Sequence, residues 1–407
     1  MLIAAVVILS LITGLWIVLA FGPWHRSGFG PQLNTSTELL ANVSFPSVTI
    51  IVPARNEEAE LPKTVPTFCM QDYPDLRVIV VDDQSEDSSL DILRKLRQEH
   101  ANLMFIRAID RPPGWCGKPW AVHEGVQHAT GELLLFTDAD CVFHPLAVKQ
   151  AVTLLQSENF DVLSLLPMME FKTLSEQIGL GGLASVLTMI MPLSMVNDPK
   201  SSAALAAGGF ILVRRSAYEK IGGHVAVKGE IIEDVKIARK LKASGAKFHC
   251  RATTDLVSTR MYEGFADLWE GLSKNAYAGS EYHPITFWFG LLGAVLMLVF
   301  PPIYLIASII TFVHHRAPVI LVFVVLSAII FLSQLIVQSR AVRYLKLPSW
   351  QILVMPISAG LYTLISINSA WEHHFRGGNL WKGRRYTRQS LLNKNADPST
   401  SEESALL

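Results

Sequence analysis

Two aspartates one residue apart, Asp138 and Asp140, have the chemistry and spacing of a metal site. They close the apolar run 131–136, which predicts a buried strand. If the strand continues through them, both side chains point to the same face of the sheet. Their oxygens could then share a hard divalent cation with phosphate oxygens and water. Capping of the helix expected after His144 is the alternative role for one of them.

A second carboxylate pair, Asp82 and Asp83, closes the apolar run 76–81 in the same way. Carboxylates are good acceptors for the N–H and O–H groups of a nucleotide base or ribose. Capping of the helix predicted from Ser88 is again the alternative.

Lys118 ends the loop Gly114-Trp-Cys-Gly-Lys118, directly before a predicted helix. Glycine lets a backbone approach a ligand closely, and a lysine can pair with a phosphate. The loop lacks the P-loop pattern, and a solvated surface lysine is the alternative.

Glu233 and Asp234 open another predicted helix. Acidic residues in a first turn commonly complement the helix dipole. A carboxylate beside an acceptor hydroxyl could instead act as a general base.

The elements that must position these residues alternate between strand and helix. Strands are predicted at 47–53, 76–83, 102–108 and 131–140, with helices from 57 and at 88–99, 119–129 and 235–243. Such alternation predicts an α/β domain with a parallel, doubly wound sheet. Ligands bind at the carboxyl ends of such strands, so the motif at 53–57 and both aspartate pairs should share one rim.

The composition excludes several other classes of protein. Of the 407 residues, 17% are charged and 50% are hydrophobic, whereas a soluble domain averages about 25% charged residues. With 35 basic and 35 acidic side chains the net charge is zero, which argues against a nucleic-acid partner. The four cysteines form no C-x-x-C pair, so neither a zinc knuckle nor a disulfide framework is expected.

The hydrophobic excess lies in four uncharged stretches, residues 1–22, 287–313, 317–339 and 348–371. Each is long enough to cross a hydrocarbon layer of about 30 Å at about 1.5 Å per residue. We therefore predict an N-terminal anchor (1–22), an α/β domain (34–284) with an interfacial helix near its end (265–282), C-terminal membrane segments (287–371) and a basic, then disordered tail (372–407). Pro301-Pro302 should break or kink the first late segment.

The orientation of the late segments is ambiguous. One basic cluster, at 340–346, follows the second late segment, and another, at 376–388, follows the third. The positive-inside rule places both in the cytoplasm, yet a full crossing would separate them. Either one late segment is re-entrant or interfacial, or one cluster lies outside.

Taken in order, these motifs resemble the signature of inverting family-two glycosyltransferases of the GT-A fold. The segments that carry the resemblance are Pro53-Ala-Arg-Asn-Glu57, Val81-Asp-Asp-Gln-Ser-Glu-Asp87, Thr137-Asp-Ala-Asp140 and Glu233-Asp234. Three more, Gly114-Trp-Cys-Gly-Lys118, 206–215 and 260–275, are similar to hopanoid-associated and carotenoid glycosyltransferases.

The resemblance implies roles for individual residues. A nucleotide-sugar donor, UDP- or GDP-linked, would be bound by Pro53, Arg55, Glu57, Asp82, Asp83, Lys118 and Asp138. Asp140, with Asp138, would hold Mg²⁺ or Mn²⁺. Asp234, with Glu233 beside it, would deprotonate the acceptor. Arg384 and Arg385 would reach the donor diphosphate, unless they form only a basic flank of the membrane segment.

We therefore expect an enzyme of the bacterial inner membrane that transfers one sugar to a lipid-like acceptor, with its catalytic domain in the cytoplasm. The Q-x-x-R-W motif of processive relatives is absent from 268–275, so a polysaccharide synthase is the second hypothesis. A noncatalytic membrane scaffold that retains the fold is the third.

Overall fold

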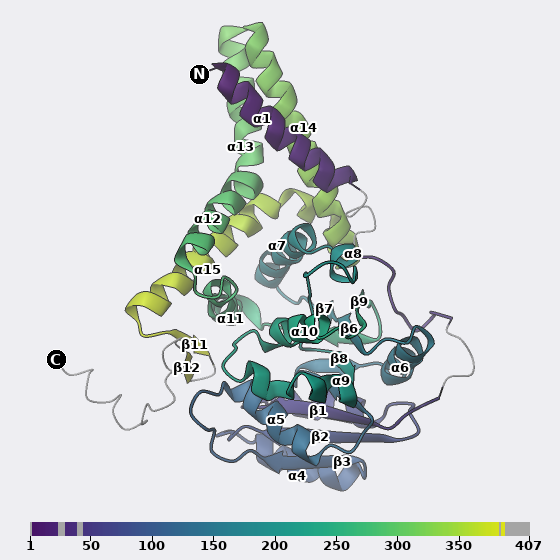
Figure 1. The fold of residues 1–407 in the computed structure, drawn as a ribbon. Helices are drawn as coiled ribbons and strands as arrows, with labels where there is room; N and C mark the ends of the chain where they lie inside the picture. The colour runs from purple at the N-terminus through teal and green to yellow at the C-terminus, as the bar shows by residue number, and fades with distance from the viewer. Residues whose placement is uncertain (1, 23–28, 39–43, 382–383, 387–407) are drawn as a thin grey trace, which may run out of the picture. The chain divides into compact units, whose positions relative to one another are not determined.

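The computed structural model describes residues 2–22, 29–38, 44–381 and 384–386, which fall into two compact units (Figure 1). One unit comprises Gln32–Glu170, Val196–Met261 and Glu372–Leu407, and contains the α/β domain. The other comprises Met1–Pro31, Phe171–Met195 and Tyr262–Trp371, and contains the hydrophobic helices. Residues 171–195 and 262–284, placed within the α/β domain by the sequence, therefore group with the hydrophobic helices.

The α/β unit is built on a seven-stranded sheet in the order β3-β2-β1-β4-β8-β6-β9. Its strands are β1 (Val48–Ala54), β2 (Leu76–Asp82), β3 (Leu103–Arg107), β4 (Leu133–Phe136), β6 (Val162–Leu166), β8 (Ile211–Arg214) and β9 (Phe248–Ala252). The strands from β3 to β4 are parallel, as predicted. β8 runs antiparallel to both of its neighbours, which the sequence analysis did not foresee.

Helices cover both faces of the sheet because successive strand residues point to opposite sides. Val78 and Val80 of β2 belong to the larger core, which also contains residues of α3 (Leu61–Cys69), α4 (Ser89–Glu99) and α6 (Ala147–Ser157). Ile79 and Val81 pack in a smaller cluster with α5 (Gly117–His128). At Gly125 a Cβ atom would lie 2.7 Å from Ile51, so a glycine lets α5 approach the sheet closely.

Smaller elements complete this unit. They are a three-stranded sheet of β5 (Cys141–Phe143), β10 (Val257–Thr259) and β7 (Met168–Met169), the helices α9 (Arg215–Lys220) and α10 (Glu233–Ala243), the 3₁₀ turn η1 (Gly223–Val227), and the hairpin β11 (Asn379–Trp381)–β12 (Arg384–Tyr386).

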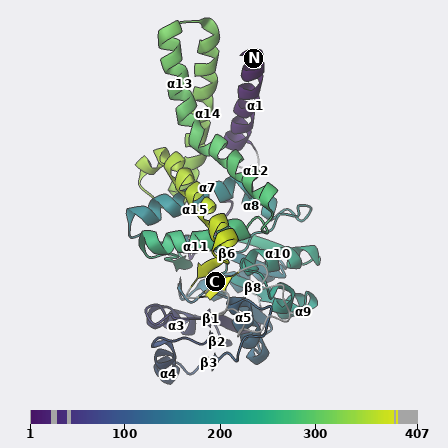
Figure 2. The same cartoon turned by 90° about the vertical axis from the view of Figure 1, so that its left-hand side faces the viewer.

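Three helices in the described part of the chain are long and apolar enough to cross a membrane. They span Ile3–Phe21 in α1 (Leu2–Phe21), Pro284–His315, and Pro318–Tyr344, which is α14. The second comprises α12 (Pro284–Ala294), η2 (Val295–Val299) and α13 (Phe300–His315). Figure 2 shows α13 and α14 as a hairpin, and α1 packs along α14.

The same unit holds α7 (Leu174–Ile190), α11 (Gly264–Ala278), η3 (Ser349–Leu353) and α15 (Met355–Phe375), while α8 (Leu193–Val196) lies at its boundary. α15 occupies most of the predicted stretch 348–371 but is not among the three candidate spans.

The Pro301-Pro302 pair does not end its helix. Residues Val295–Val299, which precede Phe300 and the prolines, form a π-helical turn, and the helix continues to His315. Proline has no N–H, so Pro302 cannot bond the carbonyl of Leu298 four residues earlier. The amide nitrogen of Gln334 in α14 donates to that carbonyl over 2.7 Å. A side chain from the neighbouring helix therefore satisfies the backbone group that the proline leaves open.

Candidate active site

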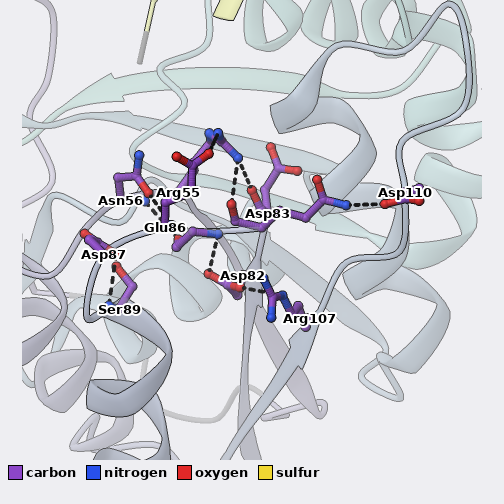
Figure 3. A network of polar contacts seen from close by, with 11 residues as sticks. Arg55, Asn56, Asp82, Asp83, Glu86, Asp87, Ser89, Arg107 and Asp110 are labelled. Carbon is purple, nitrogen blue, oxygen red and sulfur yellow. Dashed lines mark hydrogen bonds and ion pairs between the residues drawn. The ribbon is translucent and has the colours of Figure 1, made fainter. Parts of the chain in front are cut away.

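The loops that follow β1 and β2 are tied together by the motif residues themselves (Figure 3). Arg55 donates from Nη1 to the carbonyls of Asp83 and Gln84, both at 2.8 Å, and from Nη2 to Glu86 at 3.0 Å. The Asn56 side chain accepts from the N–H of Glu86 at 2.9 Å. Two separate sequence motifs thus form one rigid rim at the carboxyl ends of neighbouring strands.

Both loops turn through a left-handed residue, Asn56 with φ 52° and Gln84 with φ 57°. Such backbone angles are uncommon outside glycine and are found at functional loops. Beside them lies a hollow of about 630 Å³, lined by Arg55, Gln84, Glu86, Arg107, Ala108, Ile109 and Asp110. Its lining comes from the ends of β1, β2 and β3, where a doubly wound sheet binds its ligand.

The two aspartates at the end of β2 make different contacts. Asp82 is fully buried; its Oδ1 accepts from the N–H of Ser85 at 3.3 Å, and its Oδ2 lies 3.6 Å from Nε of Arg107. Ser85 lies in the loop before α4, which begins at Ser89, so Asp82 supports this loop and does not cap the helix. Asp83, also buried, bonds through its backbone to Ala54 and Arg55.

A lysine and two carboxylates from three different elements meet beyond the end of β4. Nζ of Lys118, in the first turn of α5, lies 2.7 Å from Asp138 and 2.6 Å from Glu233 of α10. Burial alone would lower the pKa of Lys118, but the carboxylates of Asp138, Glu233 and Asp234 outweigh it and hold the pKa well above its ordinary value. The lysine is therefore charged and bridges two of the predicted site residues.

Asp234 is held next to this cluster by backbone donors. Its Oδ2 accepts from the N–H of Gly208 at 3.1 Å, and its Oδ1 accepts from Val235 at 2.7 Å. Burial raises the pKa of Asp234 to about 6, and the Glu233 carboxylate adds to the rise, while Lys118 opposes it. A carboxylate with such a pKa is ionised near neutral pH yet retains basicity, as a general base requires.

Glycine at position 208 is required by this packing. A Cβ atom there would lie 2.7 Å from Nζ of Lys118 and 2.8 Å from Oδ2 of Asp138. The loop before β8 therefore touches the cluster through its backbone, and Thr137 fixes it by donating to the carbonyl of Gly209 at 2.8 Å.

The metal-site geometry differs from the sequence-based expectation. β4 ends at Phe136, and Ala139 and Asp140 lie in a turn. The rule that alternate strand residues share a face therefore does not apply to Asp138 and Asp140, because the chain turns to enter β5. Both carboxylates nevertheless raise the pKa of the buried Cys141 thiol, after burial itself, so both lie near that sulfur.

Within the described residues, no three His, Cys, Asp or Glu side chains form a complete metal cage. Two carboxylates are enough for an ion whose remaining ligands are phosphate oxygens and water. The chemistry of Asp138 and Asp140 thus fits a divalent cation that binds together with a diphosphate.

Two residues that the sequence analysis missed, Tyr218 and His224, line or support the site. His224 is buried, and its Nδ1 lies 2.8 Å from the Tyr218 hydroxyl, which also accepts from the His224 N–H. Burial lowers the pKa of His224 to about 3, and the Lys118 charge adds to the effect. With Pro53, Lys118, Glu233 and Asp234, His224 lines an inner cavity of about 20 Å³. The sequence signal that could have pointed to His224 is the Gly222-Gly223 pair directly before it. In the structure both glycines adopt a positive φ, 78° and 55°.

Fewer contacts are described for the remaining predicted site residues, Glu57, Arg384 and Arg385. Glu57 is half-buried, and its N–H donates to the Ser89 hydroxyl at 2.9 Å. For Arg384 and Arg385 the structure describes only the backbone, in β12, and their side chains lie outside the described part.

The chain is similar to known sugar-transferring enzymes. Residues 49–222 match the model of Glycosyl transferase family 2. A 4,4'-diaponeurosporenoate glycosyltransferase of Staphylococcus aureus strain N315 is 26% identical over 361 residues, 88% of this chain and 92% of the relative. The corresponding protein of strain USA300 is 26% identical over 85% of this chain and 90% of the relative.

One solved structure shares the fold over most of the chain. A mannosyltransferase of Pyrobaculum calidifontis, solved with GDP-mannose and Mn²⁺, aligns over 91% of this chain and 99% of its own, with a TM-score of 0.51 and 16% identity. The chain is therefore a glycosyltransferase of the GT-A fold, as the sequence predicted, and its residues 49–222 match family 2. The assignment favours the two enzymatic hypotheses over a noncatalytic scaffold.

Proposed function

We propose that this enzyme transfers a single sugar from a nucleotide-sugar donor to a lipid-like acceptor dissolved in the membrane. The observation that carries the proposal is the meeting of Lys118, Asp138, Glu233 and Asp234 beyond the end of β4. Asp138 and Asp140 suit a cation that neutralises a leaving diphosphate. Asp234, with its raised pKa, suits the removal of a proton from the attacking oxygen.

The reaction is an inverting displacement at the anomeric carbon. The acceptor oxygen forms the new bond to that carbon while the bond to the diphosphate oxygen breaks. The electron pair of the broken bond leaves with the nucleoside diphosphate, and the acceptor proton passes to Asp234. A pKa of about 6 leaves Asp234 ionised and ready to accept it at neutral pH.

Divalent metal, Mg²⁺ or Mn²⁺, fits Asp138 and Asp140. When bound, such an ion neutralises charge on the departing diphosphate. Lys118 is placed to leave Asp138 and contact a phosphate, because its flexible ammonium already lies at this rim. The mannosyltransferase with the same fold, solved with Mn²⁺ and GDP-mannose, supports both the metal and the nucleotide-sugar donor.

The acceptor is a hopanoid, a carotenoid or another lipid. The relatives named as 4,4'-diaponeurosporenoate glycosyltransferases support a carotenoid-like molecule. That name denotes a carboxylic acid, whereas a lipid alcohol would present a hydroxyl. The distinction matters at Asp234, because an ionised carboxylate needs no base and a hydroxyl does.

The catalytic domain lies on the cytoplasmic side of a bacterial inner membrane. Near the end of α14, Arg340 donates to the carbonyls of Leu19 and Ala20, the last turn of α1. The two helices therefore end at the same side of the membrane. The α/β domain follows α1 and precedes α12 in the chain, so it belongs to that side too. The basic cluster at 340–346 then identifies the side as the cytoplasm by the positive-inside rule.

The direct test incubates membranes containing the enzyme with labelled UDP- and GDP-sugars, then separates the extracted lipids. We expect label in one lipid product in the presence of Mg²⁺ or Mn²⁺, and its loss with chelator or with Asp140→Asn. Asp91→Asn, at an exposed ion pair with Arg94 on α4, is the matched control and should retain activity.

The outcomes separate the hypotheses. A ladder of oligomeric products would favour the processive synthase. Undiminished transfer by Asp140→Asn and by Asp234→Asn with a hydroxyl acceptor would refute the assigned site. Donor binding without any product from a broad set of lipids would refute the proposed acceptor class.

A further inference from the structure

Helix α15 packs mainly small and hydroxyl-bearing residues against the protein, while several of its large apolar residues face outward. Its buried positions are Met355, Ser358, Ala359, Ile365, Ser366, Ser369 and Ala370. Five of these seven are serine or alanine, whereas the core-facing stripe of an amphipathic helix on a soluble protein is apolar.

The inward face is fixed by specific contacts within the same unit. The Ser369 hydroxyl donates to the carbonyl of Ser273 in α11 and accepts from the N–H of Tyr277 at 3.0 Å. Asn368 donates to the Ser273 hydroxyl at 3.2 Å. At Gly182 in α7 a Cβ atom would lie only 2.2 Å from that of Ser358. Small residues thus let α15 approach α7 closely. These contacts fix which face of α15 points toward the protein.

The outward face is a continuous apolar stripe. Ile357 is 64% exposed, Leu364 57% and Trp371 54%. These three residues are each seven positions apart, about two helical turns, and so lie on one side of the helix. Leu353, the last residue of η3, and Ile367 extend the stripe at 60% and 42% exposure. Exposed apolar stripes of this length on a soluble surface indicate a binding partner.

Helix α15 packs against the start of a candidate membrane span. Tyr277 of α11, Phe287 of α12 and Ala370 of α15 form one buried cluster, which joins the three helices. On α12, at the start of that span, Trp288 and Phe289 are 48% and 78% exposed. Aromatic side chains concentrate where the hydrocarbon meets the headgroups, so the start of the span and the stripe on α15 have the composition of the same interface.

A transmembrane course for α15 fits poorly. It is not among the helices apolar enough to span, and its inward face presents serines and Asn368 to other helices. A crossing would also place the basic clusters at 340–346 and 376–388 on opposite sides of the membrane, against the positive-inside rule. A helix that remains on one side leaves both clusters in the cytoplasm.

We propose that α15 lies along the cytoplasmic surface of the bilayer, with the stripe formed by Leu353, Ile357, Leu364, Ile367 and Trp371 immersed in the lipid interface. The partner of this surface is the bilayer itself. The inference rests on the proposed membrane location of the enzyme but not on its reaction.

The test measures the depth of spin labels on the full-length protein in lipid vesicles. Single cysteines replace Ile357, Leu364 and Trp371, and collision rates with oxygen and with a water-soluble nickel chelate report depth. Leu332→Cys, on an exposed face near the middle of α14, calibrates the bilayer centre, and Asp91→Cys calibrates water. The four native cysteines are all buried, and the unsubstituted protein measures their background labelling.

We expect the three α15 labels to share one shallow depth, between those of the two calibration sites. A label at 364 as deep as that at 332, with shallower labels at 357 and 371, would show a crossing and overturn the proposal. Labels as accessible to the nickel chelate as that at 91 would overturn it as well. Neither result depends on turnover, so this test and the lipid-labelling test of the proposed function fail independently.

Discussion

At the scale of single residues, Lys118 connects the donor side of the site to the proposed base. It contacts Asp138 and Glu233 directly, and its charge lowers the pKa of Asp234 against the larger effects of burial and Glu233. With the base ionised above its pKa, transfer to a hydroxyl acceptor should decline as the pH falls through about 6.

Lys118→Met removes the cation that opposes the raised pKa of Asp234. We expect the pH at which kcat/KM declines on the acidic side to rise by roughly one unit. His224→Gln is the control, because His224 already has a pKa of about 3 and stays neutral over this range. A limb that stays in place in Lys118→Met, or that moves in His224→Gln, would contradict this assignment.

Asp234→Asn should lower transfer to a lipid alcohol by about 10² to 10⁴-fold, the usual contribution of a general base. With a carboxylic acceptor of matched structure the loss should be much smaller, because no proton has to be removed. Parallel rate measurements on the two acceptors check the role, and equal losses on both would show that Asp234 acts in some other way.

Gly208→Ala probes the close contact between the loop before β8 and the cluster. The added Cβ would displace Lys118 or Asp138, so we expect at least a tenfold loss of kcat/KM, an order-of-magnitude figure for a misplaced site residue. Gly360→Ala, where a Cβ meets nothing within 4 Å, should leave the rate unchanged. Circular dichroism and melting of both variants would separate a local effect from unfolding.

At the scale of elements, the sequence was sufficient for much of the fold. The β-branched runs that became β1 and β2 predict buried strands, and the helix predicted at 88–99 is found as α4. The direction of β8, Ile211-Leu-Val-Arg214, could not be predicted, because a short apolar run has the same pattern in either direction.

The site was predictable as a set of residue types but not as a set of contacts. The motif Asp138-Ala139-Asp140 was evident, whereas the turn that ends β4 before it was not, because apolar residues precede the aspartates in either case. The bridge from Lys118 to Glu233 joins positions 115 residues apart in sequence. Such pairings depend on tertiary packing, which local pattern does not encode.

The contact between Gln334 and the carbonyl of Leu298 can be tested by its contribution to stability. Gln334→Leu should destabilise the protein by about 1 kcal/mol, the scale of polar contacts within membranes, because it leaves the Leu298 carbonyl unsatisfied. Gln338→Leu is the matched control: Gln338 is buried in the same helix, and within the described part of the chain its Oε1 has no hydrogen-bond partner. Unfolding in mixed micelles provides the measurement.

The double variant sharpens this test. Pro302→Ala restores a backbone N–H near Leu298, so Gln334→Leu should cost less in that background than in the native one. An equal cost in both backgrounds would show that Gln334 stabilises the helix pair by some other route.

At the scale of the whole molecule, the side of the membrane on which each loop lies can be measured directly. The turn between α13 and α14 at Arg316 should lie outside, and Lys346, after α14, should lie in the cytoplasm. A membrane-impermeant thiol reagent should therefore label Arg316→Cys in intact spheroplasts, and Lys346→Cys only after permeabilisation. The reverse pattern would invert the orientation and place the α/β domain outside.

The bond from Arg340 to the last turn of α1 also constrains the order of events during synthesis. Its partners are 320 residues apart, so α1 must leave the ribosome and enter the bilayer long before the helix that receives it exists. Throughout that interval the α/β domain emerges and folds, tethered at its beginning and still free at its end. Assembly of the membrane helices is thus a late step that follows the folding of the α/β domain. A chain interrupted before α14 would leave its first helix with neither the Arg340 guanidinium nor the helix surface against which it packs.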